Sequence, residues 1–246
     1  MPKPLRVPLD GLAPGVCPLG APLGRYVTRV HRLGPGSRLC LFDPETGLEA
    51  EGELVDGPSP EVWCRVDELR PSGYRPLPVH LLQGLGKADK PDEVIRAATA
   101  LGVASVHLVQ TERSVARLTA ERASARIERW RRIAIEAARQ SGRGVIPVLG
   151  GPSPLPDALA VVSAATRIIL AASAEPLFCR LGRWRAREPL ALLVGPEGGL
   201  DPGERLLAAS AGFLPASLGS TTLRTELAGV AALGALVALA AAPIEP

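Results

Sequence analysis

The spacing of apolar and polar positions changes near residue 75 of this 246-residue chain. Before that point, short apolar runs are separated by Gly, Pro and Asp, which is typical of a small antiparallel barrel or sandwich. These runs are RYVTRV, SRLCLFD, LEAEGELVDG and EVWCRVDEL. Beyond it, strand-like and helical stretches alternate, which predicts βα units and a mostly parallel sheet. We therefore expect an α/β protein with two domains, 1–74 and 75–246, joined through the proline-rich stretch Pro71–Pro78.

The second domain contains six predicted strands and several predicted helices. The strand-like runs are VHLLQGL, SVHLVQ, VIPVL, RIILAAS, LALLVG and FLPASLG, and the helical stretches are PDEVIRAATALG, Glu121–Gln140 and LPDALAVVSAA. A last apolar stretch, Leu227–Ala242, has no charge but is shorter than the roughly twenty residues that a membrane-spanning helix needs. It is therefore expected to be a buried helix covered by the protein core or by another subunit.

The stretch LLVGPEGGLDPGE, Leu192–Glu204, combines an apolar strand with a turn that is poor in side chains. Its glycines permit positive φ and a close approach of the backbone to a ligand. Asp201 and Glu204 have the spacing of a capping box, and Pro202 suits the first position of a helix. The carboxyl end of a parallel strand is where open α/β sheets bind ligands. The glycines are equally compatible with an ordinary tight connection between strand and helix.

The composition excludes several classes of protein. Hydrophobic residues make up 46% of the chain, which argues against general disorder. The four cysteines form no CxxC pair, which argues against a zinc site. We expect all four to be reduced thiols. The proline-broken start MPKPLRVPLDGLAPG has no pattern of a secretory signal. We therefore expect a cytoplasmic protein without metal and without membrane insertion.

Arginine is concentrated around the long predicted helix. The stretch Glu112–Arg143 contains nine arginines and four glutamates, although the whole chain has a net charge of only +3. Arginines recur at helical steps of four, three and three and form one stripe, which consists of Arg122, Arg126, Arg129 and Arg132. Such a stripe is either a solvated helix face or a track for RNA phosphates, which the arginine fork binds through pairs of oxygens.

Nucleotide-binding and hydrolytic motifs are incomplete. GLGKA, Gly84–Ala88, lacks both the first glycine of a phosphate loop and the Ser or Thr that would bind magnesium. The three histidines are scattered, and no nucleophile elbow is present. A phosphate-loop nucleotidase and a serine or cysteine hydrolase therefore have little support.

Four ordered blocks resemble one family. They are TERSVARL, RWRRIAIEAARQSGR, LLVGPEGGLDPGE and LGSTTLRTELA, and VHRLGPGSRLCLFD is weakly similar to an early block of the same family. The chain thereby resembles the bacterial 16S ribosomal RNA uridine-N3 methyltransferases of the SPOUT class. The resemblance implies a PUA-like, RNA-binding N-terminal β-barrel and a C-terminal sheet domain with a trefoil knot. It also implies S-adenosylmethionine (SAM) as methyl donor, a homodimer, and 16S rRNA of the small ribosomal subunit as partner.

The resemblance also assigns residues to a cofactor pocket. They are Ala171, Ala172, Ser173, Gly195, Glu197, Gly198, Leu218, Gly219 and Leu223. Arg224 is the predicted stabiliser of the uridine anion, with Glu226 or Glu197 as base, although Glu226 equally suits a helix start. Predicted RNA contacts are Arg32, Arg113, Arg122, Arg126, Arg129 and Arg143. The chain departs from the family pattern at Ala97, Ala100, Thr221 and Leu227.

Two other functions are compatible with the same residues. A SPOUT methyltransferase that modifies the ribose 2′-oxygen would share the cofactor pocket. A non-catalytic RNA-binding or ribosome-assembly protein would keep the arginines and the barrel but would transfer no methyl group.

Overall fold

The computed structural model describes residues 4–114, 120–181, 184 and 188–241. The chain forms two compact units, Met1–Arg75 with Ile135–Ile146, and Pro76–Ala134 with Pro147–Pro246. Helix α3 (Ala120–Ser141) contributes its last turns to the first unit. The sequence pattern placed this whole helix in the second domain, because periodicity along a helix does not reveal which core each turn packs against.

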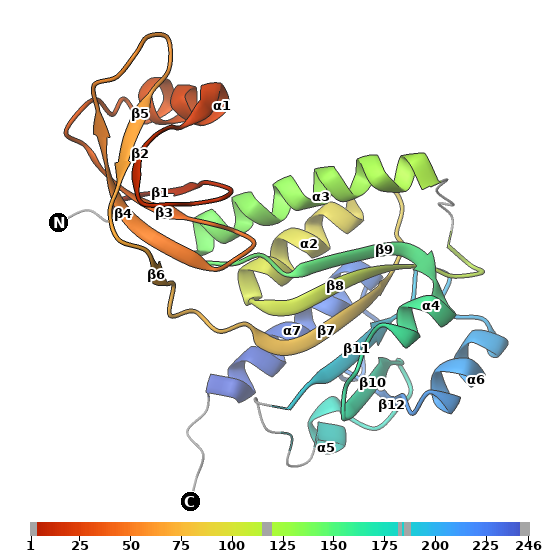
Figure 1. The fold of residues 1–246 in the computed structure, drawn as a ribbon. Helices are drawn as coiled ribbons and strands as arrows, with labels where there is room; N and C mark the ends of the chain where they lie inside the picture. Colours follow the sequence, from red (N-terminus) through yellow and green to blue (C-terminus); the bar gives the residue numbers. More distant parts are fainter. Residues whose placement is uncertain (1–3, 115–119, 182–183, 185–187, 242–246) are drawn as a thin grey trace, which may run out of the picture. The chain divides into compact units, whose positions relative to one another are not determined.

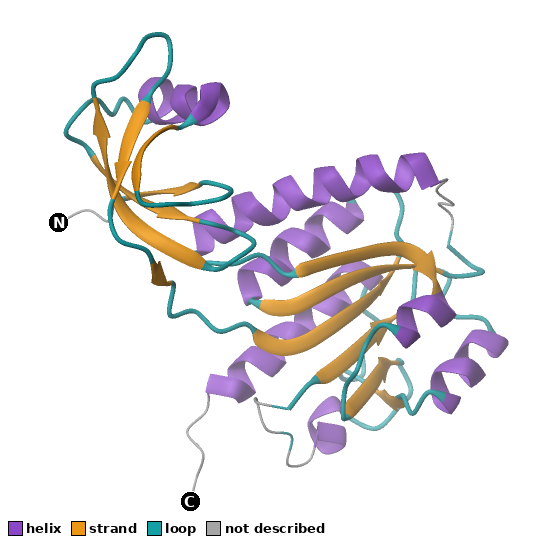
Figure 2. Ribbon diagram, in the orientation of Figure 1, coloured by secondary structure: helices purple, strands orange, loops and turns teal. Residues whose placement is uncertain are grey.

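The first unit is built on a mixed sheet (Figures 1 and 2). Its strands are β1 (Leu5–Pro8), β2 (Gly15–Pro18), β3 (Arg38–Phe42), β4 (Leu48–Val55), β5 (Trp63–Val66) and β6 (Arg70–Pro71). The strand order is β1-β3-β4-β5-β2, with β6 beside β4. β1 runs parallel to β3, and the other pairs are antiparallel. The prediction of an antiparallel sheet is wrong at β1, because the long connection to β3 allows a crossover.

The predicted strand RYVTRV is helical. Helix α1 (Gly20–Arg25) continues into a π-helical turn, η1 (Tyr26–Val30). Val27 is fully buried in the first core, while the Tyr26 ring lies 4.6 Å from the Arg139 guanidinium. Valine, threonine and tyrosine favour strands, but such preferences yield to tertiary packing of this kind.

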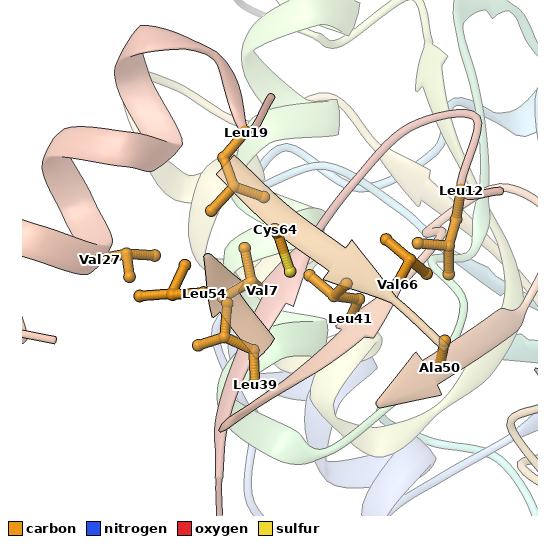
Figure 3. Close-up of a cluster of buried hydrophobic side chains, with 10 residues drawn as sticks. All are labelled: Val7, Leu12, Leu19, Val27, Leu39, Leu41, Ala50, Leu54, Cys64 and Val66. Atoms are coloured by element: carbon orange, nitrogen blue, oxygen red, sulfur yellow. The ribbon is translucent and has the colours of Figure 1, made fainter. Parts of the chain in front are cut away.

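The core of the first unit gathers side chains from its strands and from η1 (Figure 3). Its buried members are Val7, Leu12, Leu19, Val27, Leu39, Leu41, Ala50, Leu54, Cys64 and Val66. Gly52 lies within this core, where a Cβ would be 2.8 Å from a methyl of Leu41 and 2.9 Å from Cys64 Sγ. Burial raises the pKa of the Cys64 thiol to about 11, so this cysteine is a structural, protonated one.

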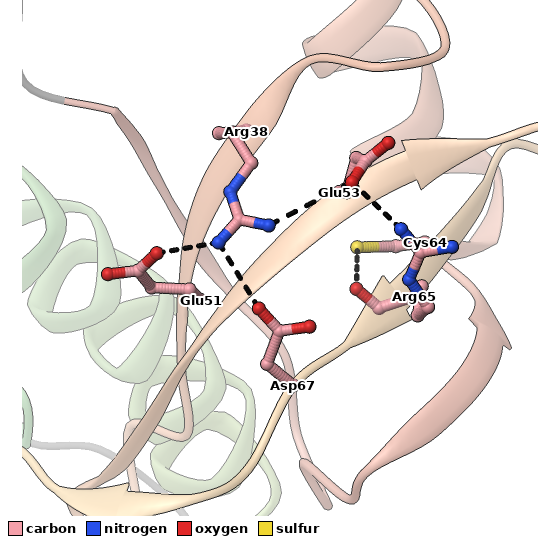
Figure 4. A network of polar contacts seen from close by, with 6 residues as sticks. All are labelled: Arg38, Glu51, Glu53, Cys64, Arg65 and Asp67. Carbon is pink, nitrogen blue, oxygen red and sulfur yellow. Dashed lines mark hydrogen bonds and ion pairs between the residues drawn. The ribbon is translucent and has the colours of Figure 1, made fainter.

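An exposed ion-pair network covers part of the same sheet (Figure 4). Arg38 donates to Glu51 at 2.7 Å and to Asp67 at 3.2 Å, and Arg65 donates to Glu53 at 2.8 Å. Three carboxylates therefore neutralise the two guanidinium groups. This patch is poorly suited to RNA phosphates, since its basic groups already have anionic partners.

The second unit has a six-stranded, wholly parallel sheet, which confirms the predicted α/β arrangement (Figure 2). The strand order is β12-β10-β11-β7-β8-β9. The strands are β7 (Leu77–Gly84), β8 (Val103–Gln110), β9 (Val148–Pro154), β10 (Thr166–Leu170), β11 (Leu190–Val194) and β12 (Leu214–Ala216). β9 begins later than the predicted run VIPVL, because Ile146 belongs to the first unit and its N–H donates to Pro44 O at 2.9 Å.

Helices cover both faces of this sheet. They are α2 (Lys90–Leu101), α4 (Leu155–Ala160), α5 (Leu177–Leu181), α6 (Pro202–Ser210) and α7 (Thr225–Ala241), together with most of α3. Leu82 packs in a cluster with Leu155 of α4 and Ala208 of α6. Leu81, which points to the other face, lies against α7 near Gly229. Burial on both faces explains why the strands are continuous apolar runs without alternation.

Helix α7 contains the apolar stretch recognised in the sequence. Leu233 and Leu236 are fully buried, and α7 packs on α2, β7 and β11. Across the described part of the chain, no helix combines the length and the hydropathy needed to span a membrane. Leu227 and Leu239 keep 52% and 38% of their surface exposed, so α7 is incompletely covered by its own chain.

Candidate functional site

A cavity of about 620 Å³ opens where β10, β11 and β12 end. The three strands are parallel, so their carboxyl ends lie at the same edge of the sheet. One wall follows β10 at Ala171 and Ala172, and a second follows β11 from Gly195 to Leu200. A third wall is the connection between β12 and α7, including Leu218, Gly219 and Leu223. Turns, rather than regular elements, thus form most of the cavity.

The turn after β11 is held by the start of helix α6. The Asp201 side chain accepts hydrogen bonds from the N–H groups of Gly203 (2.5 Å) and Glu204 (3.2 Å). Glu204 Oε2 accepts the Asp201 N–H at 3.0 Å, which completes the predicted capping box. Gly199 has φ +68°, a conformation that few other residues adopt easily. The glycine-rich turn is therefore an ordered part of the cavity wall.

Buried polar contacts connect this turn to β7 and α7. Gln83 Nε2 donates to Thr225 Oγ1 at 3.0 Å, and the Thr225 hydroxyl donates to Gly195 O. Gln83 and Thr225 are only 2% and 9% exposed, so their polar groups need hydrogen-bond partners within the protein. The first residue of α7 thereby fixes the position of the first glycine after β11.

Replacing Thr225 by valine is expected to destabilise the protein by about 1–3 kcal/mol, because the buried Gln83 amide and the Gly195 carbonyl lose a partner. Thr222→Val, at an exposed cavity position, is the matched control and is expected to change stability little. Urea unfolding measures both. Equal unfolding midpoints and slopes for the two variants would contradict this role of Thr225.

Lys90, at the start of α2, lies between the two predicted bases. Its Nζ is 3.0 Å from Glu197 Oε1 and 3.2 Å from Glu226 Oε2. Partial burial raises the pKa of Glu197, but hydrogen bonds from its own backbone N–H, from Lys90 and from the Lys87 N–H outweigh burial, and the net shift is downward. The hydrogen bond to Glu197 raises the pKa of Lys90. At neutral pH the cluster contains an ammonium and an ionised Glu197.

Arg224 is exposed and lines the cavity immediately before α7. Its carbonyl accepts the N–H groups of Leu227 (3.0 Å) and Ala228 (2.8 Å), so its backbone caps the first turn of the helix. The guanidinium is thus attached to a fixed point of the wall. A cation in this place can bind an anionic or strongly polarised oxygen of a molecule entering the cavity.

Most residues assigned to the cofactor pocket line the cavity. Those that do are Ala171, Ala172, Gly195, Glu197, Leu218, Gly219 and Leu223. Ser173, Gly198 and Glu226 are absent from the described lining. A Cβ on Gly198 would instead lie 3.1 Å from Cβ of Arg113, so this glycine accommodates a neighbouring side chain. Gly199, not Gly198, presents its backbone to the cavity.

Sequence reasoning missed Lys90, Arg205 and the threonines of the cavity wall. Thr221, Thr222 and Thr225 belong to the block LGSTTLRTELA, which was the available signal for them. Along the sequence, Lys90 is close to GLGKA but far from the glycine-rich turns that line the cavity. Only the pairing of β7 with β11 brings it to the cavity.

The predicted RNA-binding arginines have different surroundings. Arg113 donates to Gly198 O at 3.0 Å, and Arg129 binds the buried carboxylate of Asp92, which also accepts Trp130 Nε1 at 3.0 Å. The Arg143 guanidinium lies 4.3 Å from the Tyr74 ring centroid. Arg122 and Arg32 are exposed, and Arg126 is partly exposed. The two arginines of the stripe nearest the start of α3 are thus better placed for phosphate than Arg129.

The chain matches known RNA-modifying proteins over most of its length. The model of an RNA methyltransferase domain family matches residues 74–237. A ribosomal RNA small subunit methyltransferase E from Mycobacterium bovis is 31% identical, over 87% of this chain and 82% of the relative. One from Bacillus subtilis is 28% identical, over 86% of this chain and 85% of the relative.

Solved structures agree with these matches. A Legionella pneumophila protein, assigned as a methyltransferase and solved with bound SAM, is 30% identical with a TM-score of 0.87, covering 96% of this chain and 98% of its own. The ribosomal RNA small subunit methyltransferase E of Neisseria gonorrhoeae, also bound to SAM, is 28% identical with a TM-score of 0.83 and the same coverage.

Proposed function

Because the chain belongs to the RNA methyltransferase family, we propose that it uses SAM to methylate N3 of a uridine in 16S rRNA of the small ribosomal subunit. The observation that supports this most strongly is the cavity at the carboxyl edge of a parallel sheet, walled by glycine-rich turns. The resemblance of the four sequence blocks supports the choice of uridine N3. The names of the similar proteins support the small-subunit rRNA substrate.

The cavity fits SAM in size and chemistry. Its volume of about 620 Å³ is within the usual range of ligand sites. Leu218 and Leu223 offer apolar surface for an adenine ring, while the backbone of Gly195 and Gly199 offers groups for its polar edge. When bound, SAM supplies an electrophilic methyl group on a sulfonium, which leaves as a neutral thioether.

Residues of this chain must assist proton loss from the uracil imide and stabilise the resulting charge. N3 carries a proton that has to pass to a base, for which Glu226 or Glu197 is our candidate, and negative charge spreads onto the two carbonyl oxygens before the N3–methyl bond forms. Arg224 is our candidate for stabilising that charge, because its guanidinium is attached to the cavity wall beside the cofactor turns. The interaction strengthens as charge develops, which is the requirement for lowering the barrier.

RNA binding is assigned to the basic helix and to the first unit. Arg122 and Arg126 of α3 are proposed to contact phosphates, and Arg32 and Arg143 provide basic groups in the first unit. The first unit is proposed to act as a PUA-like RNA-binding module. The ion-paired patch around Arg38 is not part of this surface.

Three further features of the family are proposed for this chain. The exposed leucines of α7 support a homodimer in which a second copy covers this helix. The resemblance of the cofactor turns supports a trefoil knot formed by the chain after β11. A ribosomal RNA substrate supports a cytoplasmic location.

The decisive test is nucleoside analysis of small-subunit particles from a strain lacking this protein, after incubation with purified enzyme and SAM. The expected product is 3-methyluridine, identified by mass spectrometry and absent without enzyme. A 2′-O-methylated nucleoside would instead support the ribose methyltransferase. RNA binding without any methyl transfer would support the assembly-protein alternative.

A further inference from the structure

The turn between β7 and α2, Gly84–Lys90, packs against the glycine-rich turn that follows β11. This segment contains GLGKA, which lacks residues that a phosphate loop requires. A Cβ on Gly84 would lie only 2.4 Å from Pro196 N, and one on Gly86 would lie 3.4 Å from Glu197 Oε1. The two glycines of this segment therefore have a different use: they let one turn approach the other closely.

Polar contacts reinforce this approach. The Lys87 N–H donates to Glu197 Oε1 at 3.3 Å, and Lys90 Nζ donates to the same oxygen at 3.0 Å. Lys90 Nζ also lies 3.2 Å from Glu226 Oε2 in the first turn of α7. One ammonium thus links the beginning of α2, the turn after β11 and the beginning of α7. The last two segments border the cavity on two sides.

We propose that the β7–α2 turn is a clamp that holds the two cofactor turns together, with Lys90 as its positioning residue. The proposal rests on the proposed function, because these turns are the ones assigned to SAM. Glu197 then serves as the ionised anchor of the clamp, and Glu226 is the second carboxylate that Lys90 contacts. Glu197 therefore does not remove the uridine proton.

The electrostatics of the cluster agree with anchoring. A general base works best when its pKa is close to the working pH. The net shift of the Glu197 pKa is away from that pH. Burial raises this pKa, but hydrogen bonds from its own backbone N–H, from Lys90 and from the Lys87 N–H lower it by a larger amount. The groups that face Lys90 are Glu197 from the turn after β11 and Glu226 from α7, both of opposite charge.

The test compares Lys90→Met with Arg96→Met, since both remove one positive charge from α2 and only Lys90 lies at the cavity. Calorimetry is expected to show about tenfold weaker SAM binding for Lys90→Met and wild-type affinity for Arg96→Met. Lys90→Arg should recover most of the loss, because a guanidinium can also bridge two carboxylates. Gly86→Ala, whose Cβ would press on the Lys90 and Glu197 side chains, provides a second route to a weakened clamp.

The pH dependence separates a clamp from general destabilisation. Wild-type affinity should change little between about pH 8 and pH 5, because Glu197 stays ionised there. Without the ammonium, Glu197 loses one of the interactions that lower its pKa, so the affinity of Lys90→Met should begin to fall at a higher pH than that of the wild type. Equal affinity and equal pH profiles for Lys90→Met and wild type would overturn the clamp. Failure of the wild-type protein to bind SAM at all would overturn the proposed function instead.

Discussion

Replacing Gly219 by valine is expected to weaken SAM binding roughly 100-fold or more while leaving a folded protein. Gly219 has φ +122° and lines the cavity. A Cβ at this position would meet no described atom within 4 Å, so a larger side chain would project into the space proposed for the ligand. The β-branched side chain also disfavours this backbone conformation, which would shift the turn itself.

Gly212→Val is the matched control. Gly212 also has positive φ (+83°), in the turn between α6 and β12, but is absent from the described cavity lining. Both variants are expected to lose stability through backbone strain. Only Gly219→Val should lose SAM affinity in calorimetry. Similar losses of affinity in the two proteins would mean that strain, and not occupation of the cavity, is responsible.

Arg224→Ala is expected to lower the single-turnover rate at saturating RNA and SAM by about 10²–10³-fold, with little change in RNA affinity. The reason is that the guanidinium is proposed to bind negative charge that develops on the uracil oxygens as N3 loses its proton, and neutral ground-state uracil does not carry this charge. Methylation of a small-subunit particle by excess enzyme measures the rate, and titration of the particle measures the affinity. Loss of affinity alone would remove Arg224 from the chemical step.

Alanine at Arg122 and Arg126 provides the contrasting variants. If these side chains contact phosphates, RNA binding should weaken and its logarithmic dependence on salt should flatten by roughly one unit for each lost contact. The rate at saturation should be preserved. Arg129→Ala is a less informative variant, because Asp92 binds this guanidinium and its loss would leave a buried carboxylate with fewer partners.

The sequence by itself determined the class of the second unit and the positions of the turns that we propose bind the cofactor. Continuous apolar runs such as Leu190–Val194 identified doubly covered strands, because burial on both faces leaves no polar alternation. The glycines that follow such strands predicted turns whose backbone a ligand can approach closely. The capping box at Asp201 and Glu204 was also readable, since its contacts span only three residues. These features depend on interactions between residues that are close in sequence, so they can be predicted from the sequence alone.

Features that depend on long-range packing were decided only by the tertiary structure. The helical state of RYVTRV depends on burial of Val27 in a core assembled from four strands. Lys90 reaches Glu197, 107 residues away, because β7 pairs with β11. The same pairing brings GLGKA, an incomplete phosphate loop in the sequence, into close contact with the glycine-rich turn after β11. Arg129 has the spacing of a phosphate ligand, yet its partner is Asp92 of another helix. In each case the residue that determines the structure or the contact is distant in sequence, so it cannot be predicted from periodicity or motif spacing.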